Sequence, residues 1–426
     1  MPSYLEKYAL FPALISEAPL ADVRLMIVIP SFDEPDLQKS LEALMHCQSL
    51  EEGRVEVITV INHSERAEQA VKERHAEQHQ QLREWASEAK HPSMRHHILY
   101  CPDLPAKRAG VGIARKIGMD EAVRRFEQLG RPDGVIVCFD ADSLCAENYL
   151  RDIDAYFRQH PDCPAVSIGY AHPLEGREFS DDIYQAITSY ELHLRYFLLA
   201  KRWAGFPFAY ETIGSAMAVR SWAYQAQGGM NKRKAGEDFY FLNKFTPLDH
   251  FGEIRQPLVF PSPRQSHRVP FGTGRAVTEA LQSVDEYQTY SLASFRELKG
   301  FFDGLPQWYE QPALCLTSAN EGTAIRQYLQ RIDGPSRMED IKRHTSSYES
   351  FRKRFFRWFD AFHIMKFVHF ARDEAHPNAA VQQAAASLLT LVQGRSFESN
   401  SERELLEQYR LLSHAPSAAP SEFPEN

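Results

Sequence analysis

Short apolar runs alternate with amphipathic segments over the first two-thirds of the chain. The apolar runs are typical of strands buried within a sheet and lie at residues 25–29, 55–61, 98–101, 134–139 and 165–168. Helical patterns separate them, at residues 36–45, 64–89, 111–129 and 146–159. Strands separated by helices predict an α/β fold with a mostly parallel sheet flanked by helices.

The pattern changes after about residue 183. Long helical stretches rich in aromatic residues follow, and residues 276–409 read almost entirely as helices. We therefore expect an α/β domain over residues 1–274, a helical domain over residues 275–412 and a tail over residues 413–426. The tail is rich in Pro, Ser and Ala, a composition typical of disordered termini.

Composition and charge exclude several classes of protein. Of the 426 residues, 43% are hydrophobic and 25% are charged, as in ordinary globular proteins. The formal net charge of −9 argues against nucleic acid as a partner, because nucleic-acid binders usually carry a basic excess. The six cysteines show no C-x-x-C spacing and are interpreted as reduced thiols. No apolar stretch reaches the ~18 residues of a membrane span, and residues 1–20 lack a signal-peptide core, so we expect a cytoplasmic protein.

Two carboxylates directly follow the apolar run at residues 134–139. Asp140 and Asp142 lie at the carboxyl end of that predicted strand, the edge where open α/β sheets bind ligands. Two close carboxylates repel each other unless a cation lies between them, and Mg²⁺ and Mn²⁺ prefer oxygen ligands. A bare D-x-D is more often a turn or a helix cap, but its position after a buried strand favours a divalent-metal site.

Two earlier segments each have two interpretations. Asp33 and Glu34 follow Pro30, which we expect to end the first strand, and they could accept hydrogen bonds from a ribose or a base. Alternatively, Asp33 or Asp36 could cap the next helix. The start of the helix at residues 111–129 could receive a diphosphate or belong to a basic surface helix. Its glycine and basic residues are Lys107, Arg108, Gly110, Gly112, Arg115 and Lys116.

Three later segments are also ambiguous. Glu237 and Asp238 begin a predicted helix, where a carboxylate is usually a cap but can also act as a general base. His267, followed by Arg268, could bind a metal, although a lone histidine is more often structural. Residues 351–370 are basic and aromatic, and could lie on an anionic membrane surface or pack within the helical domain; we favour packing.

The order of these segments resembles the inverting glycosyltransferases of family 2, which have the GT-A fold. Residues 30–34 (PSFDE) are similar to the family's P-x-Y-N-E opening, with Asp33 in place of Asn. Residues 110–118 resemble its G-x-x-x-A-R-N-x-G motif, with Lys116 in place of Asn. Residues 140–142 resemble its D-x-D motif and residues 237–238 its E-D pair. The resemblance covers residues 24–274 and implies a GT-A, Rossmann-like catalytic domain.

The resemblance implies transfer of a sugar from a nucleotide-sugar donor by a single displacement that inverts the anomeric carbon. Asp140 and Asp142, with His267 as a third ligand, would hold Mn²⁺ or Mg²⁺ on the diphosphate, and Lys107, Arg108 or Arg268 would offset its charge. Asp238, beside Glu237, would take the proton of the acceptor hydroxyl. The remaining implied contacts to donor or acceptor are Pro30, Asp33, Glu34, Asn62, Gly110, Arg115, Gly214 and Ser215.

The donor, the acceptor and the class of function stay open. The family often has D-D-G-S after its second strand, where this chain has Asn62, so UDP- and GDP-sugars both fit. The acceptor could be a glycan, a lipid-linked intermediate or a small molecule. The protein itself could also make peripheral contact with the inner face of a membrane. No Q-x-x-R-W follows the E-D pair, which favours single additions over polymer synthesis. The alternatives are a sugar nucleotidyltransferase of similar fold, a non-catalytic nucleotide-sugar-binding protein and a membrane-surface protein.

Overall fold

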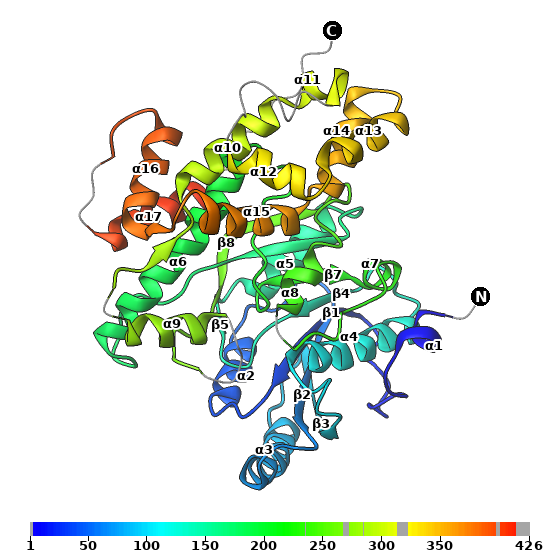
Figure 1. The fold of residues 1–426 in the computed structure, drawn as a ribbon. Coiled ribbons are helices and arrows are strands. Elements are labelled where there is room, and N and C mark those ends of the chain that lie inside the picture. Colours follow the sequence, from blue (N-terminus) through cyan, green and yellow to red (C-terminus); the bar gives the residue numbers. More distant parts are fainter. Residues whose placement is uncertain are drawn as a thin grey trace. The chain divides into compact units, whose positions relative to one another are not determined.

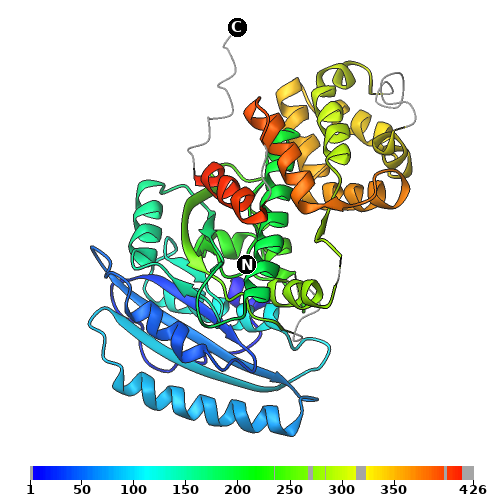
Figure 2. The same ribbon diagram turned by 90° about the vertical axis from the view of Figure 1, so that its left-hand side faces the viewer.

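The computed structural model describes residues 3–234, 236–266, 272–283, 285–312, 323–397 and 401–414 (Figures 1 and 2). The chain divides into two compact units. Unit 1 comprises Met1–Gly176 and Glu211–Arg275, and unit 2 comprises Arg177–Tyr210 and Ala276–Asn426. This division differs from the expected one because residues 177–210 group with the helices of the second unit.

The described residues of unit 1 form one sheet of eight strands in the order β3-β2-β1-β4-β7-β6-β8-β5 (Figure 1). The strands are β1 (Val23–Ser31), β2 (Arg54–Ser64), β3 (Met94–Leu104), β4 (Val135–Cys138), β5 (Leu144–Cys145), β6 (Ala165–Tyr170), β7 (Met217–Arg220) and β8 (Gly252–Phe260). Strands β1 to β4 pair in parallel, as do β6 and β8, whereas β7 runs antiparallel to β4 and β6. The short strand β5 is antiparallel to β8. The predicted α/β fold with a mostly parallel sheet is confirmed and is consistent with a GT-A-like fold.

The helices of unit 1 connect these strands. They are α1 (Tyr4–Tyr8), α2 (Leu37–Met45), α3 (Gln69–Glu88), α4 (Val111–Gln128), α5 (Tyr149–Gln159), α7 (Ser221–Ala226) and α8 (Glu237–Leu242), and α9 (Thr273–Gln282) begins at the end of the unit. The long helix α3 lies along β3 and β2 (Figure 2). Helix α4 packs on β1 and β2, and its charged side chains Arg115 and Lys116 are buried. The alternative of a basic surface helix at this position is therefore wrong.

Pro30 does not end the first strand. Strand β1 continues to Ser31, and Pro30 pairs with Val60 of β2. Pairing between β1 and β4 already ends at Val28 and Cys138. Because no ladder partner remains on that side, the missing N–H group of the proline costs no hydrogen bond there.

Unit 2 is helical. Its helices are α6 (Asp181–Trp203), α10 (Leu292–Asp303), α11 (Leu305–Glu310), α12 (Ala324–Arg331), α13 (Gly334–Arg343), α14 (Tyr348–Trp358), α15 (Ala361–Glu374), α16 (Val381–Gln393) and α17 (Glu402–His414), with the two-residue strands β9 (Gln288–Thr289) and β10 (Ala379–Ala380). Phe351, Phe355, Phe356 and Phe359 are buried, which confirms that this aromatic segment packs in the unit. Of the expected tail, Ser413 and His414 end α17, and residues 415–426 lie outside the described residues. No described helix has both the length and the apolar character needed to cross a bilayer.

Candidate active site

The candidate site lies where the strand order reverses. Strand β1 has β2 on one side and β4, the last of the four along the chain, on the other. Ligands of open α/β sheets bind outside the carboxyl ends of the strands at such a switch point. Val28 of β1 pairs in parallel with Cys138 of β4, and the Phe139 amide donates to the Val28 carbonyl over 3.1 Å. The segments that follow both strands therefore emerge side by side, and they contain Asp33, Glu34, Asp140 and Asp142.

Arg115 joins two of the predicted motifs. Its guanidinium donates one hydrogen bond to Asp140 after β4 and another to Glu237, the first residue of α8. Arg115 is only 2% exposed, and Glu237 is also buried. A buried charge is tolerated when it is paired and hydrogen-bonded, and Arg115 meets that condition with two carboxylates. The contact brings the D-x-D segment and the E-D segment into one site.

Gly214 lies against the same guanidinium. A Cβ atom at this position would stand 2.5 Å from Nη2 of Arg115, which two carboxylates hold in place. The loop before β7 can therefore approach Arg115 only because residue 214 has no side chain. Ser215, the next residue, is buried. Neither of these two small residues places a long side chain at the candidate site.

Arg264 is a second arginine that joins separate segments. It lies in the loop after β8, and its Nη2 atom donates to Glu34 and, over 3.3 Å, to Asp142. Its Nη1 atom stands 3.8 Å from Asp36. Arg264 therefore connects the segments that follow β1, β4 and β8. The sequence analysis did not predict this residue, because β8 itself was not predicted and Arg264 had no assigned place at the sheet edge.

Asp238 is half-buried at the start of α8. Burial raises the pKa of its carboxyl above the ordinary value, although the nearby Arg115 guanidinium lowers it in part. The backbone amide of Phe239 donates to its Oδ1 atom over 2.7 Å. A carboxylate with a raised pKa accepts protons more readily than an ordinary aspartate.

The basic residues before α4 lie in a turn that follows β3. Lys107 and Arg108 are exposed, and neither forms an ion pair with any other described residue. Gly110 is the N-cap of α4, and a Cβ atom there would approach Lys234 Cα to 3.0 Å. Because β3 belongs to the same parallel set as β1 and β4, this turn lies at the same edge of the sheet.

Asn62 and Asp33, two of the residues predicted to contact the donor or acceptor, form contacts within the protein. Asn62 lies inside β2, is 3% exposed and pairs with Cys101 of β3, so it does not follow the strand as expected. The extra length of β2 past residue 61 explains this difference. Asp33 accepts two hydrogen bonds from Arg74 of α3, 2.8 and 2.9 Å long, and its amide donates to His75 Nε2 over 2.8 Å. Its carboxylate is therefore positioned by α3.

The chemistry of the D-x-D segment fits a divalent cation bound together with a phosphate. The side chains of Asp140 and Asp142 are 34% and 29% exposed, and each accepts a hydrogen bond from an arginine, Asp140 from Arg115 and Asp142 from Arg264. Among the described residues no three His, Cys, Asp or Glu side chains are grouped so that they alone could hold a metal ion. Mg²⁺ commonly uses one or two protein carboxylates and completes its shell with water and substrate phosphates, which matches this pair. His267 and Arg268 lie outside the described residues.

Comparison with known proteins gives similarity to solved structures only. No protein-family model and no curated protein sequence matches the chain. The chain is similar to TarS residues 1–349 of S. aureus in complex with UDP-GlcNAc, with a TM-score of 0.40 and 12% identity over 88% of this chain and 93% of that chain. It is also similar to the mannosyltransferase PcManGT from Pyrobaculum calidifontis in complex with GDP-Man and Mn²⁺, with a TM-score of 0.36 and 13% identity over 96% and 90% of the two chains. Similarity of this extent does not carry an activity from those proteins to this chain.

The segment of residues 110–118 also takes part in a buried hydrogen-bond network. Lys116 donates over 3.0 Å both to Asp120 and to the Tyr4 hydroxyl, and Tyr224 also donates to Asp120. This buried network ties α4 to the N-terminal segment and to α7. Lys116 is therefore a structural residue, whereas Arg115 beside it faces the candidate site.

Proposed function

We propose that unit 1 is an inverting glycosyltransferase that transfers a sugar from a nucleotide-sugar donor to an acceptor hydroxyl. The proposal depends on one observation: Arg115 holds Asp140 of the D-x-D segment and Glu237 of the E-D segment at one edge of the sheet. Donor-binding carboxylates and a candidate base in one site are what a single displacement on a sugar diphosphate requires.

The donor diphosphate would bind at the switch point between β1 and β4. Lys107 and Arg108 supply free positive charge, and the start of α4 at Gly110 supplies backbone N–H groups. We assign Asp140 and Asp142 as the ligands of Mn²⁺ or Mg²⁺, with His267 as a further candidate. A cation bound there would neutralise the charge that grows on the leaving diphosphate. Asp33 and Glu34 are the proposed partners of the nucleoside.

The proposed base is Asp238. It accepts the proton of the acceptor hydroxyl while the hydroxyl oxygen forms a bond to the anomeric carbon, and the bond from that carbon to the diphosphate oxygen breaks on the opposite face. One such displacement inverts the configuration at the anomeric carbon. The raised pKa of Asp238 favours this proton transfer. Glu237 is buried against Arg115 and positions the helix start that carries Asp238.

The first experiment tests which nucleobase the donor carries. The full chain would be titrated with UDP and with GDP, each with and without Mn²⁺, in a calorimeter. We expect one of the two nucleotides to bind and its binding to strengthen with Mn²⁺. Glycan, lipid-linked and small-molecule acceptors would then be screened for transfer from the corresponding nucleotide sugar. Binding without any transfer would favour the non-catalytic alternative, and no binding of either nucleotide would contradict the proposal.

A further inference from the structure

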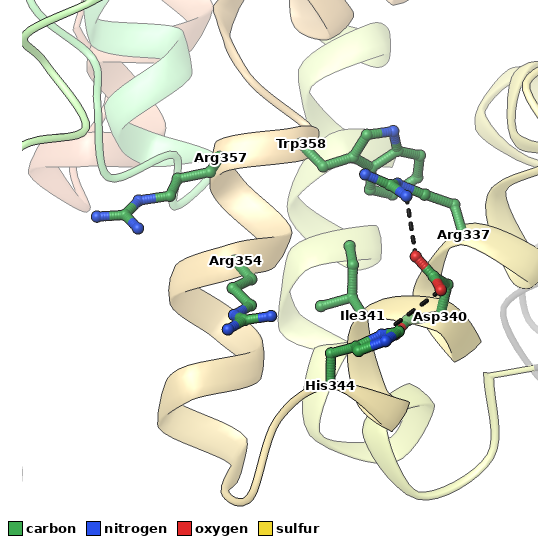
Figure 3. A pocket seen from close by; sticks show the side chains of 7 residues that line it. All are labelled: Arg337, Asp340, Ile341, His344, Arg354, Arg357 and Trp358. Carbon is green, nitrogen blue, oxygen red and sulfur yellow. Dashed lines mark hydrogen bonds and ion pairs between the residues drawn. The ribbon is translucent and has the colours of Figure 1, made fainter.

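A pocket of about 240 Å³ lies between α13 and α14 of unit 2 (Figure 3). Four basic residues line it, together with one acid and two apolar residues. They are Arg337, His344, Arg354 and Arg357; Asp340; and Ile341 and Trp358. None of these residues belongs to the candidate active site.

The charges in this pocket are unbalanced. Asp340 is the one acidic residue of the lining, and it is already engaged by Arg337 at 2.9 Å and by His344 at 3.5 Å. Arg354 and Arg357 of α14 carry no dashed line in Figure 3, and within the described part of the chain neither forms an ion pair or a hydrogen bond. This concentration of positive charge occurs in a chain whose formal net charge is −9.

The packing of α14 explains why its arginines face the solvent. Phe351, Phe355 and Phe356 form the buried side of the helix, so the residues on its other side are exposed. Arg354 and Arg357 lie on that exposed side. Trp358 and Ile341 supply an apolar part of the pocket lining beside the guanidinium groups.

We propose that this pocket binds a phosphate monoester. Guanidinium groups form paired, charge-assisted hydrogen bonds with phosphate oxygens, and the apolar lining suits the carbon atoms attached to the phosphate. The pocket volume lies just below the roughly 300–1,000 Å³ of typical small-molecule sites, which favours a ligand the size of glycerol phosphate. The same chemistry occurs in a soluble phosphate ester and in the headgroup of phosphatidic acid.

The test uses the full chain and two probes. Glycerol 3-phosphate is titrated in a calorimeter, and sedimentation is measured with phosphatidylcholine vesicles that contain or lack phosphatidic acid. The test variant is Arg354→Gln. The matched control is Arg343→Gln, which removes the same charge from an exposed position on α13 that does not line the pocket.

We expect Arg354→Gln to weaken binding of the effective probe by roughly tenfold or more, as loss of a charge-assisted hydrogen bond predicts, and Arg343→Gln to leave it nearly unchanged. Binding of glycerol 3-phosphate alone would identify a soluble ester, and binding of phosphatidic-acid vesicles would identify a lipid headgroup. Failure of the wild-type chain to bind either probe would overturn the proposal. Equal weakening by both variants would also overturn it, because the attraction would then be general. Binding of UDP or GDP should be the same in both variants and in the wild type, which separates this pocket from the proposed donor site.

Discussion

At the scale of single residues, the buried charge of Arg115 is stabilised by its two carboxylate partners. Arg115 is nearly inaccessible to water and meets one carboxylate from the segment after β4 and another from α8. Its Nη1 atom donates to Glu237 and its Nη2 atom to Asp140, so the two carboxylates use different nitrogens of one guanidinium. The arrangement makes Arg115 a positioning residue for both motifs.

Arg115→Met should therefore destabilise the protein. The substitution leaves Glu237 buried without its cation, and removal of one partner of a buried ion pair typically costs about 3–5 kcal/mol. Urea unfolding of the wild-type and variant chains measures the difference. Arg83→Met, at an exposed position on α3, is the matched control and should change the free energy of unfolding by less than about 0.5 kcal/mol. A similar free energy for Arg115→Met and wild type would show that the bridge is not maintained in solution.

Asp238→Asn separates catalysis from folding. The variant should bind donor normally and lose transfer by about 10²–10⁴-fold, the usual contribution of a general base. Because burial raises the pKa of Asp238, its charged form is disfavoured in the fold, and its stabilising contribution is lost as pH rises through that pKa. The uncharged asparagine should therefore leave the free energy of unfolding at pH 7 unchanged or higher. Retained turnover would remove Asp238 from the proposed mechanism.

The pH dependence of transfer follows from the same group. Protonated Asp238 cannot accept the acceptor's proton, so kcat/KM should fall as pH decreases through its pKa. The raised pKa places this loss at a higher pH than the ~3.9 of an ordinary aspartate. A profile of kcat/KM against pH, recorded where circular dichroism shows the chain folded, measures it. An acid limb at or below the ordinary aspartate value would contradict the assignment.

At the scale of elements, the contact between α4 and the sheet is set by a glycine. A Cβ atom at Gly118 would stand 2.5 Å from Val28 of β1 and 3.2 Å from Val60 of β2. Helix α4 can therefore lie close to these strands, and this position brings Arg115, one turn earlier, to the carboxyl edge of the sheet.

Gly118→Ala should destabilise the protein by about 1–3 kcal/mol, because the added methyl group overpacks a close contact. Gly300→Ala in α10 is the matched control. A Cβ atom there meets nothing within 4 Å, so the alanine should keep or raise stability by up to about 1 kcal/mol. Thermal unfolding of both variants gives the comparison, and equal midpoints would argue against close packing of α4 on β1.

At the scale of the whole molecule, donor binding should stabilise the folded state. A ligand that binds only the folded chain at one hundred times its dissociation constant adds about 2.7 kcal/mol. UDP or GDP with Mn²⁺ should therefore raise the midpoint of thermal unfolding, and EDTA should reverse the shift. Asp142→Ala removes a proposed cation ligand and should abolish the Mn²⁺-dependent part. A shift of wild-type size in Asp142→Ala would argue against Asp142 as a metal ligand.

Much of the sheet could be predicted from the sequence by itself. Strands β1 to β4 and β6, and helices α2 to α5, follow from apolar runs and helical patterns that each act over a few residues. The segments after β1 and β4 could be placed at one edge because parallel strands point their carboxyl ends the same way. This local information was sufficient to name Asp140, Asp142 and the E-D pair as candidates.

Only the tertiary structure decided which of these residues meet. Strand β7 (MAVR) has only three apolar residues before Arg220, and β8 contains Arg255, Gln256 and Pro257, so neither shows the apolar run expected of a buried strand. Without β8, the loop that carries Arg264 has no place in the fold. Arg115 and Glu237 pair although they are 122 residues apart in the sequence, and Arg264 and Glu34 pair although they are 230 residues apart. Such pairings follow from how the elements pack in space, which local periodicity does not contain.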